Sequence, residues 1–218
     1  MLRREKIRSV SAAIGLLAAF ALWTAAVLLV DVRAIGPLGS QVGLAALNSF
    51  VHEWTGVHMG LYVLTDWLGL VPVGIGVGFA LLGLRQWAAR RKLRKVDRSL
   101  LVLGAFYIVV LGAYVFFESA VVNYRPVLIE GILEASYPSS TTMLVLCVLP
   151  TASMQLCGRI KSRALCRLVS AAAAAFSALM VAGRLLSGVH WCSDIIGGVL
   201  LSAGLVLLYR AAVLPKEK

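Results

Sequence analysis

The sequence has little charge for its length. Only 14% of its 218 residues are Asp, Glu, Lys or Arg and 60% are apolar, whereas a soluble domain is about a quarter charged and about half apolar. This composition excludes a disordered or collagen-like chain and favours a protein whose solvent is the lipid bilayer. At about 20 residues per membrane-spanning helix, the length allows about six spans and no sizeable additional domain.

Cysteine is also scarce. The four cysteines include no CxxC pair, which excludes a disulfide-dense secreted scaffold, and the sequence shows no convincing cluster of metal ligands. Three of the four lie in or beside apolar stretches, so we interpret the cysteines as small hydrophobic residues rather than as a disulfide or a metal site. They are Cys147, Cys157, Cys166 and Cys192.

Six apolar segments are each about long enough to cross roughly 30 Å of hydrocarbon as an α-helix. The first is too long for a cleaved signal peptide, and no small-x-small site follows it before Asp31. The stretch from Gly36 to Gly56 is too short to span twice, and we expect it to form a short interfacial helix in the first external loop. The predicted fold is therefore all-α, a six-transmembrane-helix bundle that forms a single membrane domain over residues 1–218. The expected spans are residues 9–32, 64–84, 99–117, 138–156, 164–182 and 194–213.

Small residues are spaced four apart within the second expected span. Gly74 and Gly78 form a small-xxx-small pair, which favours close packing of another helix rather than a nucleotide loop, because no phosphate-binding lysine follows.

The positive charges are sorted between alternate loops. Eighteen of the 21 Lys and Arg residues fall on one side of the predicted membrane, and only Arg33, Arg125 and Arg184 fall on the other. Because cytoplasmic loops collect Lys and Arg, we expect both termini to be cytoplasmic in a bacterial cytoplasmic membrane. The net charge of +11 then needs no nucleic-acid partner to explain it.

Three polar stretches fall on the side with few cations, where they are able to converge. In the last of them His190 and Asp194 are four residues apart, so on a helix the carboxylate would accept one imidazole proton and leave the other nitrogen free as a nucleophile or base. Arg184 adds a planar set of donors suited to phosphate oxygens. The stretches are Asn123 to Pro126, Tyr137 to Thr142 and Gly183 to Asp194.

The start of the fourth expected span strengthens this pattern. Ser139 and Ser140 place hydroxyl groups and free backbone N–H groups at a helix N-terminus, which attracts anions, and Arg125 supplies a second cation. Proline and serine also open ordinary helices, so only the combination is informative. Two arginines, a helix N-terminus and an oriented histidine together indicate a phosphoryl-transfer site.

This ordered set resembles the type 2 phosphatidic acid phosphatase superfamily of membrane lipid phosphatases. The family pattern is Lys-x6-Arg-Pro, then Pro-Ser-Gly-His, then Ser-Arg-x5-His-x3-Asp. Arg125-Pro126 matches the end of the first motif and Pro138-Ser139 the start of the second. Arg184, His190 and Asp194 have the spacing of the third, with Gly183 in place of its serine. The resemblance covers roughly residues 60–213, which we expect to form the phosphatase-like core.

The resemblance implies a role for each matching residue. His190 would be the nucleophile that forms a phosphohistidine intermediate, and Asp194 would orient and stabilise it. Arg125, Arg184, Ser139 and Ser140 would hold the phosphate oxygens. The resemblance implies no cofactor and no metal.

Two family positions carry different residues here. Glu118 stands seven residues before Arg125, where the family has lysine, and a carboxylate there would weaken phosphate binding unless it points elsewhere. Thr141 replaces the histidine that protonates the leaving group in the family, and a general acid typically contributes about 10²–10⁴-fold to the rate. Candidates to replace that histidine are His52, His58, Glu130 and Glu134.

These patterns predict an integral membrane phosphatase that acts on a lipid phosphate or diphosphate from the outer leaflet. A phosphate leaving group departs unprotonated, whereas an alkoxide needs a proton, so the missing acid favours a polyprenyl diphosphate. In a bacterium the resemblance implies undecaprenyl diphosphate recycling, or dephosphorylation of phospholipids or lipid A. The alternative is a catalytically degenerate protein that binds lipid phosphates or acts as a scaffold. A transporter is less favoured, because the spans show no internal repeat or charge at the membrane centre.

Overall fold

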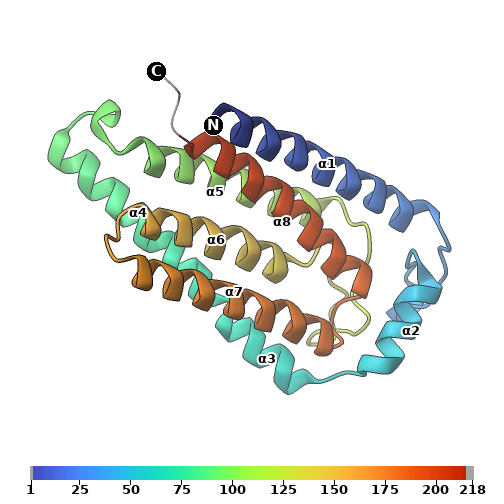
Figure 1. Ribbon diagram of the computed structural model, residues 1–218. Coiled ribbons are helices and arrows are strands. Elements are labelled where there is room, and N and C mark those ends of the chain that lie inside the picture. The colour runs from blue at the N-terminus through green and yellow to red at the C-terminus, as the bar shows by residue number, and fades with distance from the viewer. Residues whose placement is uncertain (1, 215–218) are drawn as a thin grey trace.

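Six long helical segments run side by side in the computed structural model, which describes residues 2–214 (Figure 1). Within these residues the chain forms helices and loops and no β-strand. α3 and α4 follow one another at Gly69 and together make one span, so the prediction of an all-α, six-span fold is confirmed. The elements are α1 (Leu2–Leu29), η1 (Pro37–Gly39), α2 (Ala45–Thr55), α3 (Met59–Leu68), α4 (Leu70–Arg90), η2 (Leu93–Lys95), α5 (Arg98–Ser119), α6 (Ser140–Cys157), α7 (Arg163–Leu186) and α8 (Cys192–Val213).

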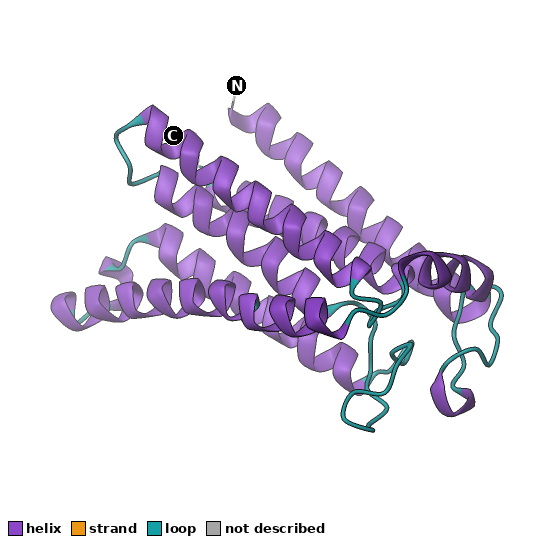
Figure 2. Ribbon diagram, turned by 90° about the horizontal axis from the view of Figure 1, so that it is seen from below, coloured by secondary structure: helices purple, strands orange, loops and turns teal. Residues whose placement is uncertain are grey.

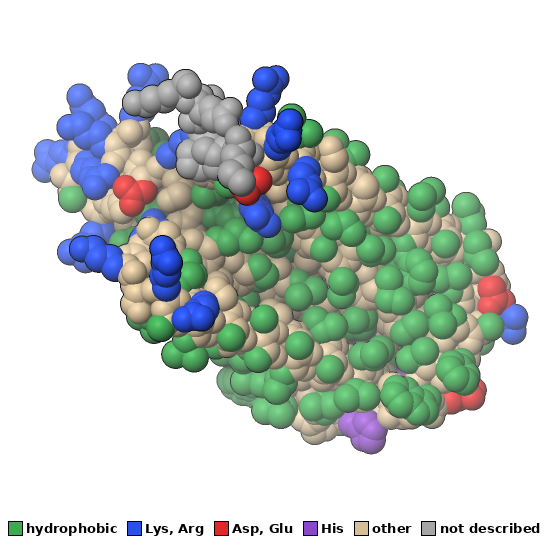
Figure 3. Space-filling model, in the orientation of Figure 1, with side chains coloured by type: hydrophobic (Ala, Val, Ile, Leu, Met, Phe, Trp, Pro, Cys, Tyr) green, Lys and Arg blue, Asp and Glu red, His purple; other side chains and the backbone are tan. Residues whose placement is uncertain are grey.

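The two ends of the bundle differ in charge. Lys and Arg side chains gather at the end where α1 begins and α8 ends, and hydrophobic side chains cover the helices between the ends (Figure 3). The helices satisfy their own backbone hydrogen bonds, so their apolar side chains can face lipid. The longer loops and α2 lie at the opposite end (Figure 2). We call the two ends the basic end and the loop end.

α6 lies at the centre of the bundle and positions the loop end. It packs against α4, α5, α7 and α8, and α1 packs along the outer side of α8. α6 and α8 are the most buried spans. Their shared core with α5 contains Leu103, Phe106, Val110, Met143, Cys147, Leu201, Leu205 and Tyr209.

α2 is the helix expected between Gly36 and Gly56. It buries Asn48 and exposes Leu47, Phe50 and Trp54. An apolar outer face on a short helix at the loop end fits a helix that lies in the membrane interface.

The loop between α7 and α8 is held against the end of α2. Gly188 has a φ of +68°, in the left-handed region that favours glycine, and a Cβ at this position would overlap the carbonyl oxygen of Gly56. The backbone N–H of His58 also donates to the carbonyl of Ser187 at 2.9 Å. These contacts fix the loop that carries His190.

Two interpretations of the sequence are wrong. Cys157 and Cys166 form a disulfide between the end of α6 and the first turn of α7, because the short α6–α7 connection brings the two helix ends together. Cys147 and Cys192 are buried free thiols, as expected of small hydrophobic residues.

No helix packs closely on the Gly74–Gly78 pair within residues 2–214, since a Cβ at either glycine would have open space around it.

Candidate active site

His190 is the centre of the polar cluster at the loop end. It lies in the α7–α8 loop, two residues before α8, and is 3% exposed. Arg184 Nη2 donates to His190 Nε2 at 3.2 Å, and Arg125 Nη1 donates to the same nitrogen at 3.4 Å. Because Nε2 accepts, the imidazole proton belongs on Nδ1, and the Nε2 lone pair faces the two arginines.

Asp194 lies behind the imidazole, in the first turn of α8. Its Oδ2 is 3.7 Å from His190 Nδ1. The same oxygen accepts a hydrogen bond from the backbone N–H of Trp191 at 3.0 Å. The spacing of four residues predicted that His190 and Asp194 share one face of a helix. Instead His190 precedes α8, so the two side chains meet at the start of the helix.

A network of amides and hydroxyls holds Asp194 in place. Asn123 Nδ2 donates to Asp194 Oδ1 at 3.3 Å, and Asn48 Nδ2 donates to the hydroxyl of Ser193 at 2.9 Å. The backbone N–H of Ser193 donates in turn to Asn48 Oδ1 at 3.1 Å. α2, the α5–α6 loop and α8 are thereby joined behind the carboxylate.

The two arginines are buried and come from different elements. Arg184, in the last turn of α7, is 1% exposed, and Arg125, in the α5–α6 loop, is 8% exposed. Arg184 Nη1 donates to the hydroxyl of Thr65 at 3.4 Å. Arg125 Nε lies 2.9 Å from a carboxylate oxygen of Glu134.

The start of α6 adds unused hydrogen-bonding groups. Ser139 precedes α6, is fully buried, and its backbone N–H donates to the carbonyl of Asp194 at 3.1 Å. Among the described residues, five buried polar atoms of this region lack a hydrogen-bond partner. Because buried polar atoms are normally paired, they indicate a site that binds a polar ligand. These atoms are Arg125 Nε, Ser139 Oγ, Thr142 Oγ1, Arg184 Nε and His190 Nδ1.

The surroundings of His190 keep it neutral. Burial first, and then the charges of Arg125 and Arg184, hold its pKa well below the ordinary value of 6.5. A neutral imidazole beside two guanidinium groups is suited to attack an anionic phosphorus centre, because the arginines neutralise the anion while Nε2 keeps its lone pair.

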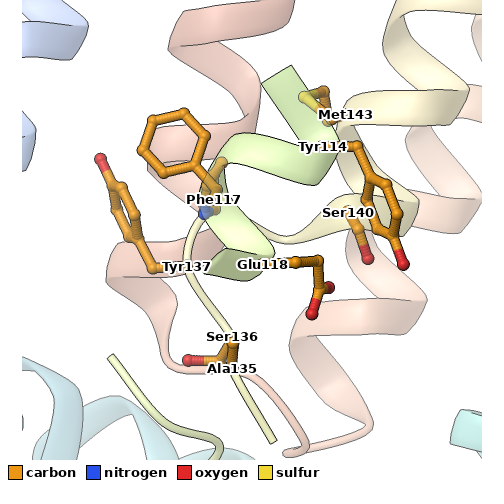
Figure 4. Close-up of a pocket in the computed structure, with 9 residues that line it drawn as sticks. Tyr114, Phe117, Glu118, Ala135, Ser136, Tyr137, Ser140 and Met143 are labelled. Carbon is orange, nitrogen blue, oxygen red and sulfur yellow. The ribbon is translucent and has the colours of Figure 1, made fainter. Parts of the chain in front are cut away.

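Glu118 does not join this cluster. It is exposed near the end of α5 and lines a small pocket with Tyr114, Ser136 and Ser140 (Figure 4). In the part of the chain that the structure describes, no ion pair joins it to Arg125 or Arg184. Ser140 therefore faces this neighbouring pocket, while Ser139 lies beside Asp194.

Among the described residues, no hydrogen bond or ion pair joins Thr141, His52 or His58 to the two arginines. The methyl group of Thr141 faces Gly69, at the junction of α3 and α4. His52 packs its ring on Trp191 with the ring centres 5.3 Å apart, and His58 Nε2 is 2.9 Å from the carbonyl of Thr55. Of the four candidate proton donors named from the sequence, Glu134 is the one that contacts an arginine of the site.

Sequence reasoning missed the contribution of α3. Tyr62, Thr65 and Asp66 all face the arginines: the Arg184 guanidinium lies over the Tyr62 ring, and Arg184 Nη1 is 3.9 Å from Asp66 Oδ1. A tyrosine, threonine and aspartate within one apolar span, near the loop end, were the available signal. Within residues 2–214, no three His, Cys, Asp or Glu side chains gather as metal ligands.

This geometry defines a class: a six-helix membrane protein in which one histidine, one aspartate and two arginines gather at the loop end. The family model of the PAP2 superfamily matches residues 106–217, just over half of the chain. The chain belongs to this superfamily. The match contains Arg125, Ser139, Arg184, His190 and Asp194.

A solved structure shares the fold. The chain is similar to the crystal structure of a transmembrane PAP2 type phosphatidylglycerolphosphate phosphatase from Bacillus subtilis, with a TM-score of 0.52 and 20% sequence identity. The similarity covers 91% of this chain and 93% of that one. A comparison with curated protein sequences gave no match.

Proposed function

We propose that this protein is an integral membrane phosphatase that hydrolyses a lipid phosphate on the extracytoplasmic side through a phosphohistidine intermediate. The observation that carries this proposal is the convergence of Arg125 Nη1 and Arg184 Nη2 on His190 Nε2, within 3.4 Å. Membership of the PAP2 superfamily supports phosphatase chemistry. The charge difference between the two ends supports an outward-facing site.

The reaction has two displacements at phosphorus. His190 Nε2 gives its lone pair to phosphorus, and the bond from phosphorus to the leaving oxygen breaks with its electrons on that oxygen. Asp194 stabilises the positive charge that develops on the imidazole. Water then attacks the phosphohistidine, releasing inorganic phosphate and regenerating the free histidine, while both arginines bind the phosphoryl oxygens throughout.

The preferred substrate in this proposal is a polyprenyl diphosphate, such as undecaprenyl diphosphate. Thr141 has no titratable proton to give to a leaving group, and its methyl group packs toward Gly69. A phosphate leaving group has a pKa of about 6 and departs without protonation, whereas an alkoxide resembles hydroxide, whose parent water has a far higher pKa. The site therefore suits an anhydride better than a monoester.

Phosphate release by the purified protein tests the proposal. We expect release from a polyprenyl diphosphate to exceed release from polyprenyl monophosphate and phosphatidate, and His190→Ala to abolish it together with an acid-labile phosphoenzyme. Thr141→His should raise monoester turnover selectively, because it restores a general acid.

His58→Ala is the matched histidine control, because its ring nitrogen is held by Thr55 and touches neither arginine. Full activity in His190→Ala would eliminate the mechanism. Binding of lipid phosphate without any release would favour the degenerate binding protein. Equal rates on phosphatidate and the diphosphate would remove the substrate preference.

A further inference from the structure

Two buried cations lie unusually close together in this site. The guanidinium groups of Arg125 and Arg184 both contact His190 Nε2, at 3.4 and 3.2 Å, and both residues are at least nine-tenths buried. Like charges repel, and burial removes the water that would screen them. The groups that contact the two arginines must therefore offset this repulsion.

The ring of Tyr62 is in contact with both arginines. It lies in the first turns of α3, with the central guanidinium carbon of Arg184 5.0 Å and that of Arg125 5.9 Å from its ring centre. The face of an aromatic ring is electronegative and attracts cations at such distances, most strongly where water is excluded.

The carboxylates that pair with the arginines each contact one arginine only among the described residues. Glu134 contacts Arg125 alone, through Nε, and Asp66 contacts Arg184 alone, through Nη1. Among residues 2–214, His190 and Tyr62 are thus the two side chains that contact both arginines. In the proposed reaction His190 attacks phosphorus, so the ring of Tyr62 is the shared contact that can keep both arginines in place.

We infer that Tyr62 is a positioning residue that holds Arg125 and Arg184 at the spacing of one phosphoryl group. The inference rests on the proposed function, because the ligand that the arginines share is the phosphoryl group of the substrate. The ring lies outside the segment that carries the family motifs, on the α3 side of the cluster. Its electronegative face, rather than its hydroxyl group, does the positioning.

Substitutions at position 62 separate the ring from the hydroxyl group. Binding of orthovanadate and inorganic phosphate to the full-length protein in detergent is measured by calorimetry, and KM and kcat are measured on the lipid. Tyr62→Phe should bind within about twofold of the original protein, since the ring is kept. Tyr62→Leu should bind about tenfold more weakly or worse, with KM rising more than kcat falls, because His190 and Asp194 stay in place.

A fluorinated phenylalanine series at position 62 preserves the shape of the ring while withdrawing charge from its face. Affinity for vanadate should fall progressively with each added fluorine, and this series decides the question if Tyr62→Leu fails to fold. Trp67→Leu is the matched control, because Trp67 is an exposed aromatic residue of the same helix and does not touch the arginines. Its affinity should be unchanged.

Affinity that stays constant across the fluorinated series would overturn the inference. Phosphate binding that depends on the ring, without hydrolysis of any lipid, would overturn the enzymatic function and support the role of Tyr62. Failure of the unmodified protein to bind either vanadate or phosphate would overturn both.

Discussion

His190 owes its chemistry to the residues that surround it. Its Nε2 accepts from two arginines while its Nδ1 faces Asp194, so the fold selects both the tautomer and the neutral state. Burial contributes most to the lowered pKa, ahead of the two charges. A buried, neutral histidine has consequences for how the protein responds to acid.

We expect His190 to remain unprotonated below pH 6.5, because its pKa lies well below that ordinary value. The unfolded chain takes up this proton near pH 6.5 and the folded protein does not, so the contribution of His190 to the free energy of unfolding should fall as the pH drops through that window. Imidazole NMR of the free protein measures the first effect, and thermal unfolding as a function of pH measures the second. A His190 titration midpoint at or above 6.5 would contradict both.

The residues of the candidate site could be named from the sequence, but the residues that support them could not. His190, Asp194, Arg125, Arg184 and Ser139 fall in spaced motifs, and the structure brings them together. Asn48 and Ser193 stabilise Asp194 through contacts between segments 145 residues apart, and such contacts leave no local pattern. The contacts of Tyr62 could not be predicted for the same reason, because its partners belong to α7 and to the α5–α6 loop.

At the scale of elements, the close contact between α3 and α7 explains a departure from the family motif. Gly183 stands where the motif has serine, one residue before Arg184. A Cβ there would lie 2.7 Å from the Thr65 methyl group, closer than side-chain atoms tolerate. Glycine therefore lets α3 approach α7 and bring Tyr62 and Thr65 to the arginine.

Gly183→Ser should lower the free energy of unfolding by about 1–3 kcal/mol, because the added Cβ overpacks this contact. Thr65→Ser removes the opposing methyl group and keeps the hydroxyl that accepts from Arg184. The double variant should recover most of the loss, measured by thermal unfolding of all four proteins in detergent. Independent, additive losses would show that the two helices do not meet at this pair.

At the scale of the whole molecule, the apolar segments were sufficient to predict the six-span fold. Each span must satisfy its own backbone in lipid, so its length and composition are visible in the sequence. The break between α3 and α4 and the disulfide between α6 and α7 were not predicted, because both depend on how neighbouring residues pack.

The orientation in the membrane remains a prediction that follows from the charge at the two ends. A cysteine probe at Glu130, in the α5–α6 loop, should react with an impermeant reagent added outside intact cells. A probe at Lys92, in the connection between α4 and α5, should react only after the membrane is opened. Both positions are exposed, so disrupted membranes supply the control for reactivity. The reverse pattern would place the site in the cytoplasm.

The bond between Cys157 and Cys166 lies at the basic end, beside Lys161, Arg163 and Arg167. Cytoplasmic thiols are kept reduced by glutathione and thioredoxin, whereas the other side of a bacterial membrane is oxidising. In a living cell, a cytoplasmic basic end therefore predicts that Cys157 and Cys166 are reduced, whereas an external basic end predicts that they form the disulfide. The redox state of this cysteine pair in cells, trapped by alkylation before lysis, therefore reports the orientation of the protein in the membrane. This measurement needs no introduced label.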